Sequence, residues 1–96
     1  MTKKEFLSGE ELKLLRALSD EARLGIIKIL LEKECECVCN LSSKIKKDQS
    51  VVFRHIMILK EAGIVKTEKK NKFLFCRIKD KNSLLKFFKL VKNFKK

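Results

Sequence analysis

Apolar residues recur at helical spacing in the first third of the chain, where they predict two helices. Leu12, Leu15 and Leu18 mark a short first helix. A second helix is expected to end near Lys33. Ser19 is its predicted N-cap, because a Ser side chain accepts a hydrogen bond from first-turn N–H groups. The broad apolar stripe of the second helix comprises Leu24, Ile27, Ile29, Leu30 and Leu31.

Two further helices joined by a tight turn are predicted in the middle of the chain. Leu41 and Ile45, four residues apart, mark a short helix, and residues 46–47 form the turn. Asp48 is the predicted N-cap of a longer helix, and Gly63 is its predicted C-terminal cap because glycine tolerates the left-handed conformation there. The apolar face of the longer helix consists of Val52, Ile56 and Leu59.

The spacing of the apolar residues changes from helix-like to strand-like after Gly63. Residues 64–68 and 73–78 are rich in β-branched and aromatic residues and predict two strands, with residues 69–72 as a polar tip between them. A last helix follows, capped by Asn82 or Ser83. Its apolar face comprises Leu84, Phe87, Phe88, Val91 and Phe94. The order α-α-α-α-β-β-α predicts a mostly α domain with a β-hairpin wing, a winged helix-turn-helix, over residues 1–96.

The charge of the chain is concentrated in its second half. The net charge is +12, from 24 Lys and Arg against 12 Asp and Glu. Residues 1–41 have a balance of −1, whereas residues 42–96 have a balance of +13. A basic half of a folded domain is typical of a protein whose partner is a polyanion, and together with the helix pattern it favours double-stranded DNA.

Length and composition exclude several classes of protein. A chain of 96 residues forms one small domain with a thin core, to which dimerisation would add stability. No apolar run approaches the roughly 20 residues of a membrane span, and residues 1–10 contain no long apolar stretch of a secretory signal, so we expect a cytoplasmic protein without a membrane partner. A single His, with no Ser/His/Asp arrangement and no phosphate-binding loop, makes an enzyme improbable.

The second helix of a helix-turn-helix pair can lie in the major groove of DNA, where its N-terminal and solvent-facing side chains contact bases. Gln49 can pair with adenine, Arg54 with guanine or phosphate, and Val51 can contact a thymine methyl. Capping remains an alternative role for Gln49 and Ser50, and Arg54 can be an ordinary exposed arginine. The predicted DNA-binding residues of this segment are Lys47, Gln49, Ser50, Val51, Phe53 and Arg54.

The tip of the predicted hairpin has a composition suited to the DNA backbone. It consists of Lys69, Lys70, Asn71 and Lys72. Lysine ammonium groups contact phosphates, and a narrow basic tip can also enter a minor groove. A solvated turn with no partner is the alternative.

Three cysteines alternate with other residues immediately before the third helix, at Cys35, Cys37 and Cys39. Clustered thiolates bind soft metal or metalloid ions, or they oxidise. In a regular helix residues i and i+2 point about 200° apart, and in a strand they share a face with Cα atoms about 6.6 Å apart. We therefore expect binding of one ion by Cys37 and Cys39 to require local bending of the backbone. A redox pair of Cys35 with Cys39 and a purely structural role remain alternatives. Cys76, in the second predicted strand, is expected to be a core thiol.

Four phrases of the sequence resemble one protein family. Residues 18–24 (LSDEARL) resemble the family phrase LSDPTRL, and residues 37–41 (CVCNL) resemble CVCDL. Residues 49–56 (QSVVFRHI) resemble QSTVSHHL, and residues 59–65 (LKEAGIV) resemble LREAGLV. In register, they resemble the ArsR/SmtB family of bacterial and archaeal metal-responsive repressors.

The resemblance implies a homodimer joined by the first and last helices, which binds an inverted-repeat operator and releases it when an inducer binds. In the family, the cysteine pair matched by Cys37 and Cys39 binds As(III), Sb(III), Cd, Pb or sometimes Zn. Cys35 is an addition, and Ser42 stands at the position of a further family cysteine, so Cys35, Cys37 and Cys39 are the predicted metal ligands. The family's other metal site needs His ligands on the last helix, where this chain has Asp80 but no His.

Three positions bear on how well this chain fits the family pattern. Lys46 stands where the family often has glycine in the turn, which requires another turn geometry or a left-handed lysine. Phe53 replaces a small polar residue that faces DNA, and it either contacts thymine methyls or folds back into the core. His55 matches the family's helix histidine, and we interpret it as structural rather than as a metal ligand.

The sequence therefore predicts a transcriptional repressor that a soft metal or metalloid releases from its operator. A redox-responsive or ligand-independent DNA-binding regulator is an alternative. A third hypothesis is a protein-interaction module, in which the last helix binds a partner and the basic half is only surface. DNA binding with a steep salt dependence distinguishes the regulators from this module.

Overall fold

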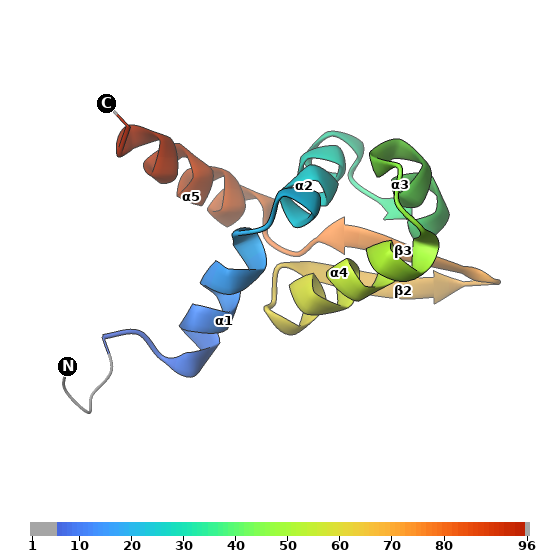
Figure 1. Cartoon of the computed structure of the whole chain (residues 1–96), viewed down its shortest axis with the longest axis horizontal. Helices are drawn as coiled ribbons and strands as arrows, with labels where there is room; N and C mark the ends of the chain where they lie inside the picture. The colour runs from blue at the N-terminus through green and yellow to red at the C-terminus, as the bar shows by residue number, and fades with distance from the viewer. Residues whose placement is uncertain (1–5, 96) are drawn as a thin grey trace.

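A computed structural model describes residues 6–95, which form five helices and a three-stranded antiparallel sheet (Figure 1). The winged helix-turn-helix order predicted from the sequence is confirmed, with one additional short strand before the third helix. The elements are α1 (Gly9–Leu18), α2 (Glu21–Lys33), β1 (Glu36–Cys37), α3 (Val38–Ile45), α4 (Gln49–Glu61), β2 (Val65–Lys70), β3 (Phe73–Ile78) and α5 (Lys81–Asn93).

Carboxylates cap two of the helices, in place of the predicted residues. The N-cap of α2 is Asp20 rather than Ser19, and its side chain accepts a hydrogen bond from the Arg23 N–H at 3.0 Å. The N-cap of α5 is Asp80 rather than Asn82 or Ser83; its Oδ1 accepts from the Ser83 N–H at 3.1 Å. A carboxylate is favoured at these positions because it also complements the positive end of the helix dipole.

The end of α4 directs the chain into the hairpin. Gly63, the predicted cap, has a φ of 81°. Its N–H donates to the Lys60 carbonyl at 3.0 Å, and the next N–H, of Ile64, donates to the Leu59 carbonyl at 2.9 Å. This pair of bonds is the Schellman motif, which satisfies the last helix carbonyls while reversing the chain. Ile64 and Val65 are consequently buried at the start of β2.

The sheet has the order β1-β3-β2, so β3 is its central strand. In β1, Glu36 pairs with Cys76 and Cys37 pairs with Phe75. The hairpin of β2 and β3 is longer than predicted, because Lys70 pairs with Phe73. Lys69 and Lys70 therefore belong to β2, and the turn itself is Asn71–Lys72, with Asn71 at a φ of 57°. Asn tolerates the left-handed conformation that a two-residue hairpin turn requires.

The core lies between the helices and the inner face of the sheet. Val52, Ile56 and Leu59, the predicted apolar face of α4, are fully buried, and Cys76 is a core thiol as predicted. The other large side chains that are fully buried are Ile26, Ile27, Leu30 and Leu41. Across residues 6–95, no helix is both long enough and apolar enough to cross a membrane. The prediction that there is no secretory signal was based on residues 1–10, of which residues 1–5 lie outside the described residues.

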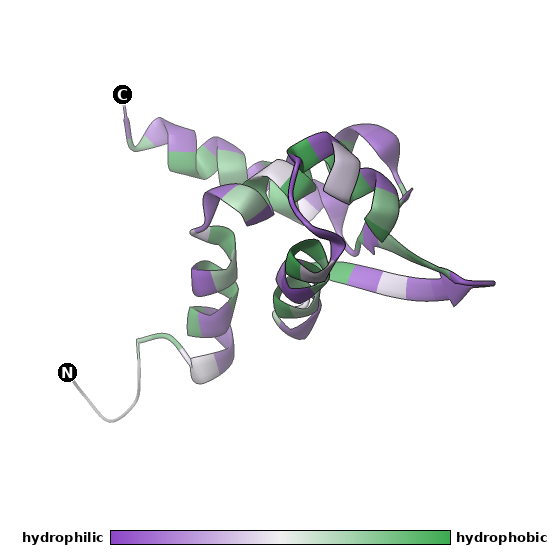
Figure 2. Cartoon of the chain, turned by 45° about the vertical axis from the view of Figure 1, so that its right-hand side comes forward, coloured by the Kyte–Doolittle hydropathy of each residue, from purple (hydrophilic) through white to green (hydrophobic). Residues whose placement is uncertain are grey.

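The two terminal helices lie at one end of the molecule, opposite the hairpin (Figure 1). On α5 only Leu84 is buried, Phe87 and Phe88 are half-buried, and Val91 and Phe94 are exposed. Apolar residues alternate with polar ones along this helix, whereas β2 is mostly hydrophilic (Figure 2). The predicted apolar face of α5 thus extends well beyond the core of the single chain.

Candidate nucleic-acid interface and thiol pair

The turn between α3 and α4 is stabilised by Ser42 and does not use glycine. Lys46 adopts the left-handed conformation, with φ 58° and ψ 50°, which is one of the two outcomes that its replacement of glycine predicts. The Ser42 carbonyl accepts from the Lys47 N–H at 3.2 Å, and the Ser42 hydroxyl donates to the Lys47 carbonyl. These bonds position α4 relative to α3.

The N-terminus of α4 is a positive helix end with no acidic side chain bonded to it. Asp48 occupies the N-cap position, but its side chain makes no capping hydrogen bond, so it does not cap in the expected way. Its backbone carbonyl instead accepts from the N–H groups of Val51 and Val52, each at 3.0 Å. A helix N-terminus attracts anions, and DNA phosphates are the relevant anions for a chain of this charge.

The predicted DNA-binding side chains of α4 lie at the surface. Gln49, Ser50 and Arg54 are exposed, whereas Val51 is half-buried. Phe53 is 46% exposed, which shows that it does not fold back into the core. Lys47, in the turn, is also exposed.

The wing presents its basic side chains away from the helices. Lys69, Lys70, Asn71 and Lys72 are all exposed, and the hairpin projects beyond the helices at one end of the molecule (Figure 1). Lys69 and Lys70 lie on β2 and Lys72 lies in the turn, so the basic residues follow the strand as well as the tip. This placement suits contacts with successive phosphates.

A groove of about 550 Å³ separates the start of α4 from the hairpin. Two of the clustered cysteines line it, together with residues predicted to contact DNA. The groove residues are Cys37, Val38, Cys39, Gln49, Ser50, Phe53, Lys69, Lys72, Phe73 and Leu74. The sequence pattern did not predict this adjacency, because it depends on the pairing of β1 with β3.

Cys37 lies just before α3, and Cys39 lies in its first turn. Cys37 is the N-cap of α3, with φ −82° and ψ 157°, and its Sγ accepts from the Asn40 N–H at 3.3 Å. The regular helical spacing assumed for the two cysteines does not apply, because α3 begins at Val38 and Cys37 lies outside the helix. That an ion bends the backbone on binding stays a prediction. The pKa of the Cys39 thiol is raised by its hydrogen bond with Cys37, and secondarily by burial and by the charge of Cys37.

Cys35 lies apart from the Cys37–Cys39 pair. It is exposed and lines a second depression, together with residues that include Cys76 and Arg77. Glu34, just before it, has a φ of 66° and a ψ of −54°, which turns the chain sharply at this point. Burial, with a smaller contribution from the Cys35 charge, raises the pKa of Cys76 to about 12. Within residues 6–95, no three His, Cys, Asp or Glu side chains converge as a metal site.

His55 makes contacts consistent with a structural role. Its Nδ1 lies 3.1 Å from Nη1 of Arg23 and 4.0 Å from Oδ2 of Asp20. Burial lowers the pKa of His55; the Asp20 charge opposes this effect, and nearby cations reinforce it. The pKa of Asp20 is itself lowered, mainly by the hydrogen bond from the Arg23 N–H. The Arg23 guanidinium favours a neutral His55 imidazole, whose Nδ1 accepts a hydrogen bond from it.

Comparison with known families adds an independent observation. Residues 20–67, which include α2 to α4, match the family described as "Bacterial regulatory protein, arsR family". The chain belongs to the ArsR family. An uncharacterised HTH-type transcriptional regulator of Methanocaldococcus jannaschii is 40% identical over 67 residues, which cover 70% of this chain and 75% of the relative. The arsenical resistance operon repressor of Escherichia coli is 34% identical over 67 residues, covering 70% of this chain and 57% of the repressor.

A comparison with solved structures finds a similar fold. A homodimeric winged helix-turn-helix DNA-binding domain from Mycobacterium bovis, described as a possible ArsR-family regulator, superposes with a TM-score of 0.77 at 17% identity. The match covers 88% of this chain and 79% of that domain. This ArsR-family protein is therefore a winged helix-turn-helix transcriptional regulator, and it belongs to a class of DNA-binding proteins that are not enzymes.

Proposed function

We propose that this ArsR-family protein is a homodimeric repressor that binds an inverted-repeat operator and is released by a thiophilic metal or metalloid at Cys37 and Cys39. The observation that supports this proposal most directly is the shared groove. The two thiols line it together with Gln49, Ser50 and Phe53 of α4 and Lys69 and Lys72 of the wing. An ion held by the thiols therefore lies among the side chains that contact DNA.

Unburied apolar surface on the terminal helices supports the homodimer. Leu12 and Leu15 of α1 are each 39% exposed, and Leu90 and Phe94 of α5 are 59% and 88% exposed. A single chain rarely leaves so much apolar surface in water, and a two-fold symmetric partner buries it. The homodimeric domain of Mycobacterium bovis has the same fold.

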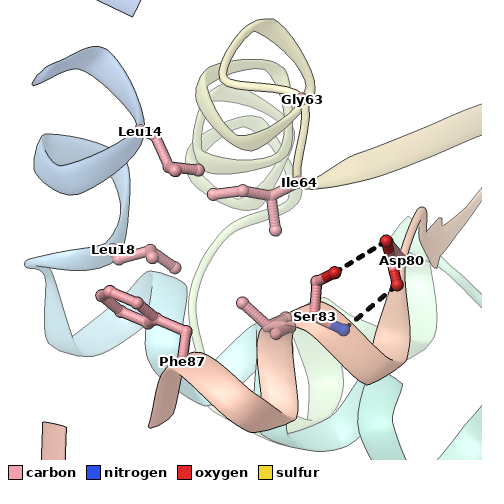
Figure 3. Close-up of a pocket in the computed structure, with 8 residues that line it drawn as sticks. Leu14, Leu18, Gly63, Ile64, Asp80, Ser83 and Phe87 are labelled. Carbon is pink, nitrogen blue, oxygen red and sulfur yellow. Dashed lines mark hydrogen bonds between the residues drawn. The ribbon is translucent and has the colours of Figure 1, made fainter. Parts of the chain in front are cut away.

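A cavity of about 150 Å³ lies between these two helices and the turn that precedes β2. Leu14 and Leu18 of α1, Ile64, and Phe87 of α5 point into it, as Figure 3 shows. Asp80 accepts two hydrogen bonds from Ser83 at the edge of the cavity and so anchors the first turn of α5. In the proposed dimer, this imperfectly filled junction of α1 and α5 lies beside the interface.

DNA binding follows from the placement of α4 and the wing. With α4 in the major groove, Gln49 reads adenine, Arg54 contacts guanine or phosphate, and Val51 meets a thymine methyl. Lys69, Lys70 and Lys72 follow the phosphate backbone while Asn71 sits at the tip. The +13 balance of residues 42–96 supplies the long-range attraction for the polyanion.

The pair of thiols fits a soft inducer better than a hard one. Thiolates select ions such as As(III), Sb(III), Cd, Pb and Zn over Mg or Ca. The E. coli relative is named as an arsenical resistance repressor, which agrees with this choice of inducer. Cys37 and Cys39 hold the ion, and the groove residues around them give it direct access to the DNA-contacting side chains. A disulfide between Cys35 and Cys39 is less favoured, because the two thiols line separate depressions.

A binding assay on the DNA upstream of the chain's own gene tests this proposal. The purified protein is bound to the labelled fragment, and arsenite, cadmium, zinc and diamide are added separately. We expect a thiophilic ion to release the DNA from wild type, and neither Cys37→Ser nor Cys39→Ser to respond. Cys35→Ser is the matched control and should respond like wild type. Release by diamide alone, or an unaltered response of Cys37→Ser, contradicts the proposal.

A further inference from the structure

The thiol pair in the groove has two protein ligands, not three. Cys37 and Cys39 line the groove, whereas Cys35 lines a separate depression. The sharp turn at Glu34 and the pairing of Glu36 with Cys76 hold Cys35 there. Among the described residues 6–95, no three His, Cys, Asp or Glu side chains converge as a metal site. The structure therefore separates a dithiol from the third clustered cysteine.

Two thiols complete the bonding of a different arsenic species from the one that three thiols complete. Trivalent arsenic forms three bonds, so inorganic arsenite needs three thiolates or keeps an oxygen ligand. An arsenical with one carbon substituent, R–As(OH)₂, needs only two thiols. Two As–S bonds form as two As–O bonds break, each thiol proton leaves with a hydroxide as water, and no oxidation state changes. Soft thiolate sulfur is the preferred ligand for such a centre.

The groove next to the dithiol has space and apolar surface for the carbon substituent. Phe53 from α4 and Phe73 from β3 line the same groove as the two thiols, and they are 46% and 51% exposed. Leu74 adds a half-buried aliphatic side chain. An aromatic ring placed against these side chains loses contact with water and gains offset or edge-to-face contacts with the phenylalanines.

We infer that the groove is a binding site for a trivalent arsenical with one apolar carbon substituent, with Cys37 and Cys39 bonded to arsenic and the substituent packed against Phe53 and Phe73. This inference rests on the proposed function for its regulatory consequence, but the binding itself does not depend on DNA. Phe53 then has two roles, because it faces DNA in one state and the substituent in the other.

Phenylarsine oxide, which hydrates to the phenyl form of R–As(OH)₂, is the probe for this site. Intact-protein mass spectrometry of the full chain under reducing conditions should show one phenylarsenic group per chain. We expect the same occupancy in Cys35→Ser and its loss in Cys37→Ser and in Cys39→Ser. Arsenite, titrated in parallel, should bind at least tenfold more weakly than phenylarsine oxide.

Phenylalanine variants test the placement of the substituent. Phe53→Ala should weaken phenylarsine oxide binding about tenfold, consistent with the loss of one aromatic contact and its buried area. Phe6→Ala is the matched control, because Phe6 is 87% exposed and does not line the groove. Circular dichroism checks that both variants fold. Equal weakening in the two variants contradicts the inference.

The outcomes separate this inference from the proposed function. Arsenite that binds as tightly as phenylarsine oxide, and loses its affinity in Cys35→Ser, would overturn the dithiol site while leaving a metalloid-responsive repressor intact. Phenylarsine oxide bound through Cys37 and Cys39 without release of DNA would support the site and overturn the proposed regulation.

Discussion

The guanidinium of Arg23 joins the middle of α4 to the end of α1 through His55. Its Nη1 lies 3.1 Å from His55 Nδ1, and its Nε donates to the Ala17 carbonyl at 2.7 Å. Ala17 is the second-last residue of α1, so one side chain connects α1, α2 and α4. The DNA-contacting helix is thus held to the rest of the domain by a hydrogen bond that needs a neutral histidine.

This contact predicts a pH dependence of stability. The pKa of His55 in the folded chain lies below its ordinary value near 6.5, because burial and neighbouring cations disfavour the imidazolium. The unfolded chain therefore takes up a proton before the folded chain does, and the His55 contribution to stability is lost as the pH falls below about 6.5. Denaturant unfolding at several pH values measures this effect.

The variant His55→Gln is the control for that titration. Glutamine keeps a hydrogen-bonding group but does not titrate, so its stability should fall less steeply between pH 7 and pH 5. His55 is the only histidine of the chain, so its imidazole proton resonances give its pKa directly. A measured value above 6.5 would contradict the assigned environment.

The left-handed Lys46 predicts a stabilising substitution. Lys46→Gly keeps the left-handed backbone but removes its steric cost, which is about 1–2 kcal/mol for a residue other than glycine. The greater freedom of glycine in the unfolded chain offsets part of this gain in stability. We expect a net gain of about 0.5 kcal/mol in the free energy of unfolding. Lys47→Gly removes the same charge at a position without positive φ and should be destabilising. Equal effects of the two substitutions would show that Lys46 is not strained.

The buried face of α4 predicts a large loss of stability on truncation. Ile56 is fully buried, so Ile56→Ala removes buried methylene and methyl groups and leaves a cavity. The expected loss is about 2–5 kcal/mol in the free energy of unfolding. Ile58, on the same helix, is 40% exposed, and Ile58→Ala should cost much less. Chemical denaturation of both variants provides the measurement.

The basic side chains of the wing predict a change in the salt dependence of DNA binding. Replacing both Lys70 and Lys72 with Ala should weaken binding to all DNA sequences and lower the magnitude of the slope of log K against log salt by about 1 per lost phosphate contact. Lys13→Ala, on α1 at the end of the molecule away from the wing, is the control (Figure 1). An unchanged slope in the double variant would show that these wing lysines do not contact DNA phosphates.

Much of the fold was predictable because its signals are local. The i, i+4, i+7 spacing of Val52, Ile56 and Leu59 defined the buried face of α4, and Gly63 marked its end. The N-caps were predicted less well. Ser19 and Asp20 are adjacent potential caps, and only the position at which the backbone becomes helical decides between them.

The sequence predicted Cys37 and Cys39 as ligands, but it could not predict the backbone geometry that places them. A two-residue strand such as β1 has no periodicity of its own and exists because Cys37 pairs with Phe75 on a distant strand. That pairing removes Cys37 from helical geometry, and Cys37 then lines the same groove as Cys39. It also explains why Cys35, two residues earlier, does not join them. The placement of the cysteines beside Phe53 in one groove depends on the same long-range pairing.

In the proposed mechanism the thiol pair and the DNA-binding surface share one groove. Binding of an arsenical to the thiols therefore weakens the binding of operator DNA, and operator DNA weakens the binding of the arsenical. Titrating phenylarsine oxide into the protein with and without its operator, and measuring the bound arsenic, tests this coupling most directly. By linkage, operator should weaken arsenical binding by the same factor by which the arsenical weakens operator binding, with a factor of about 5–150 as the usual range. Equal arsenical affinities with and without operator would contradict the mechanism.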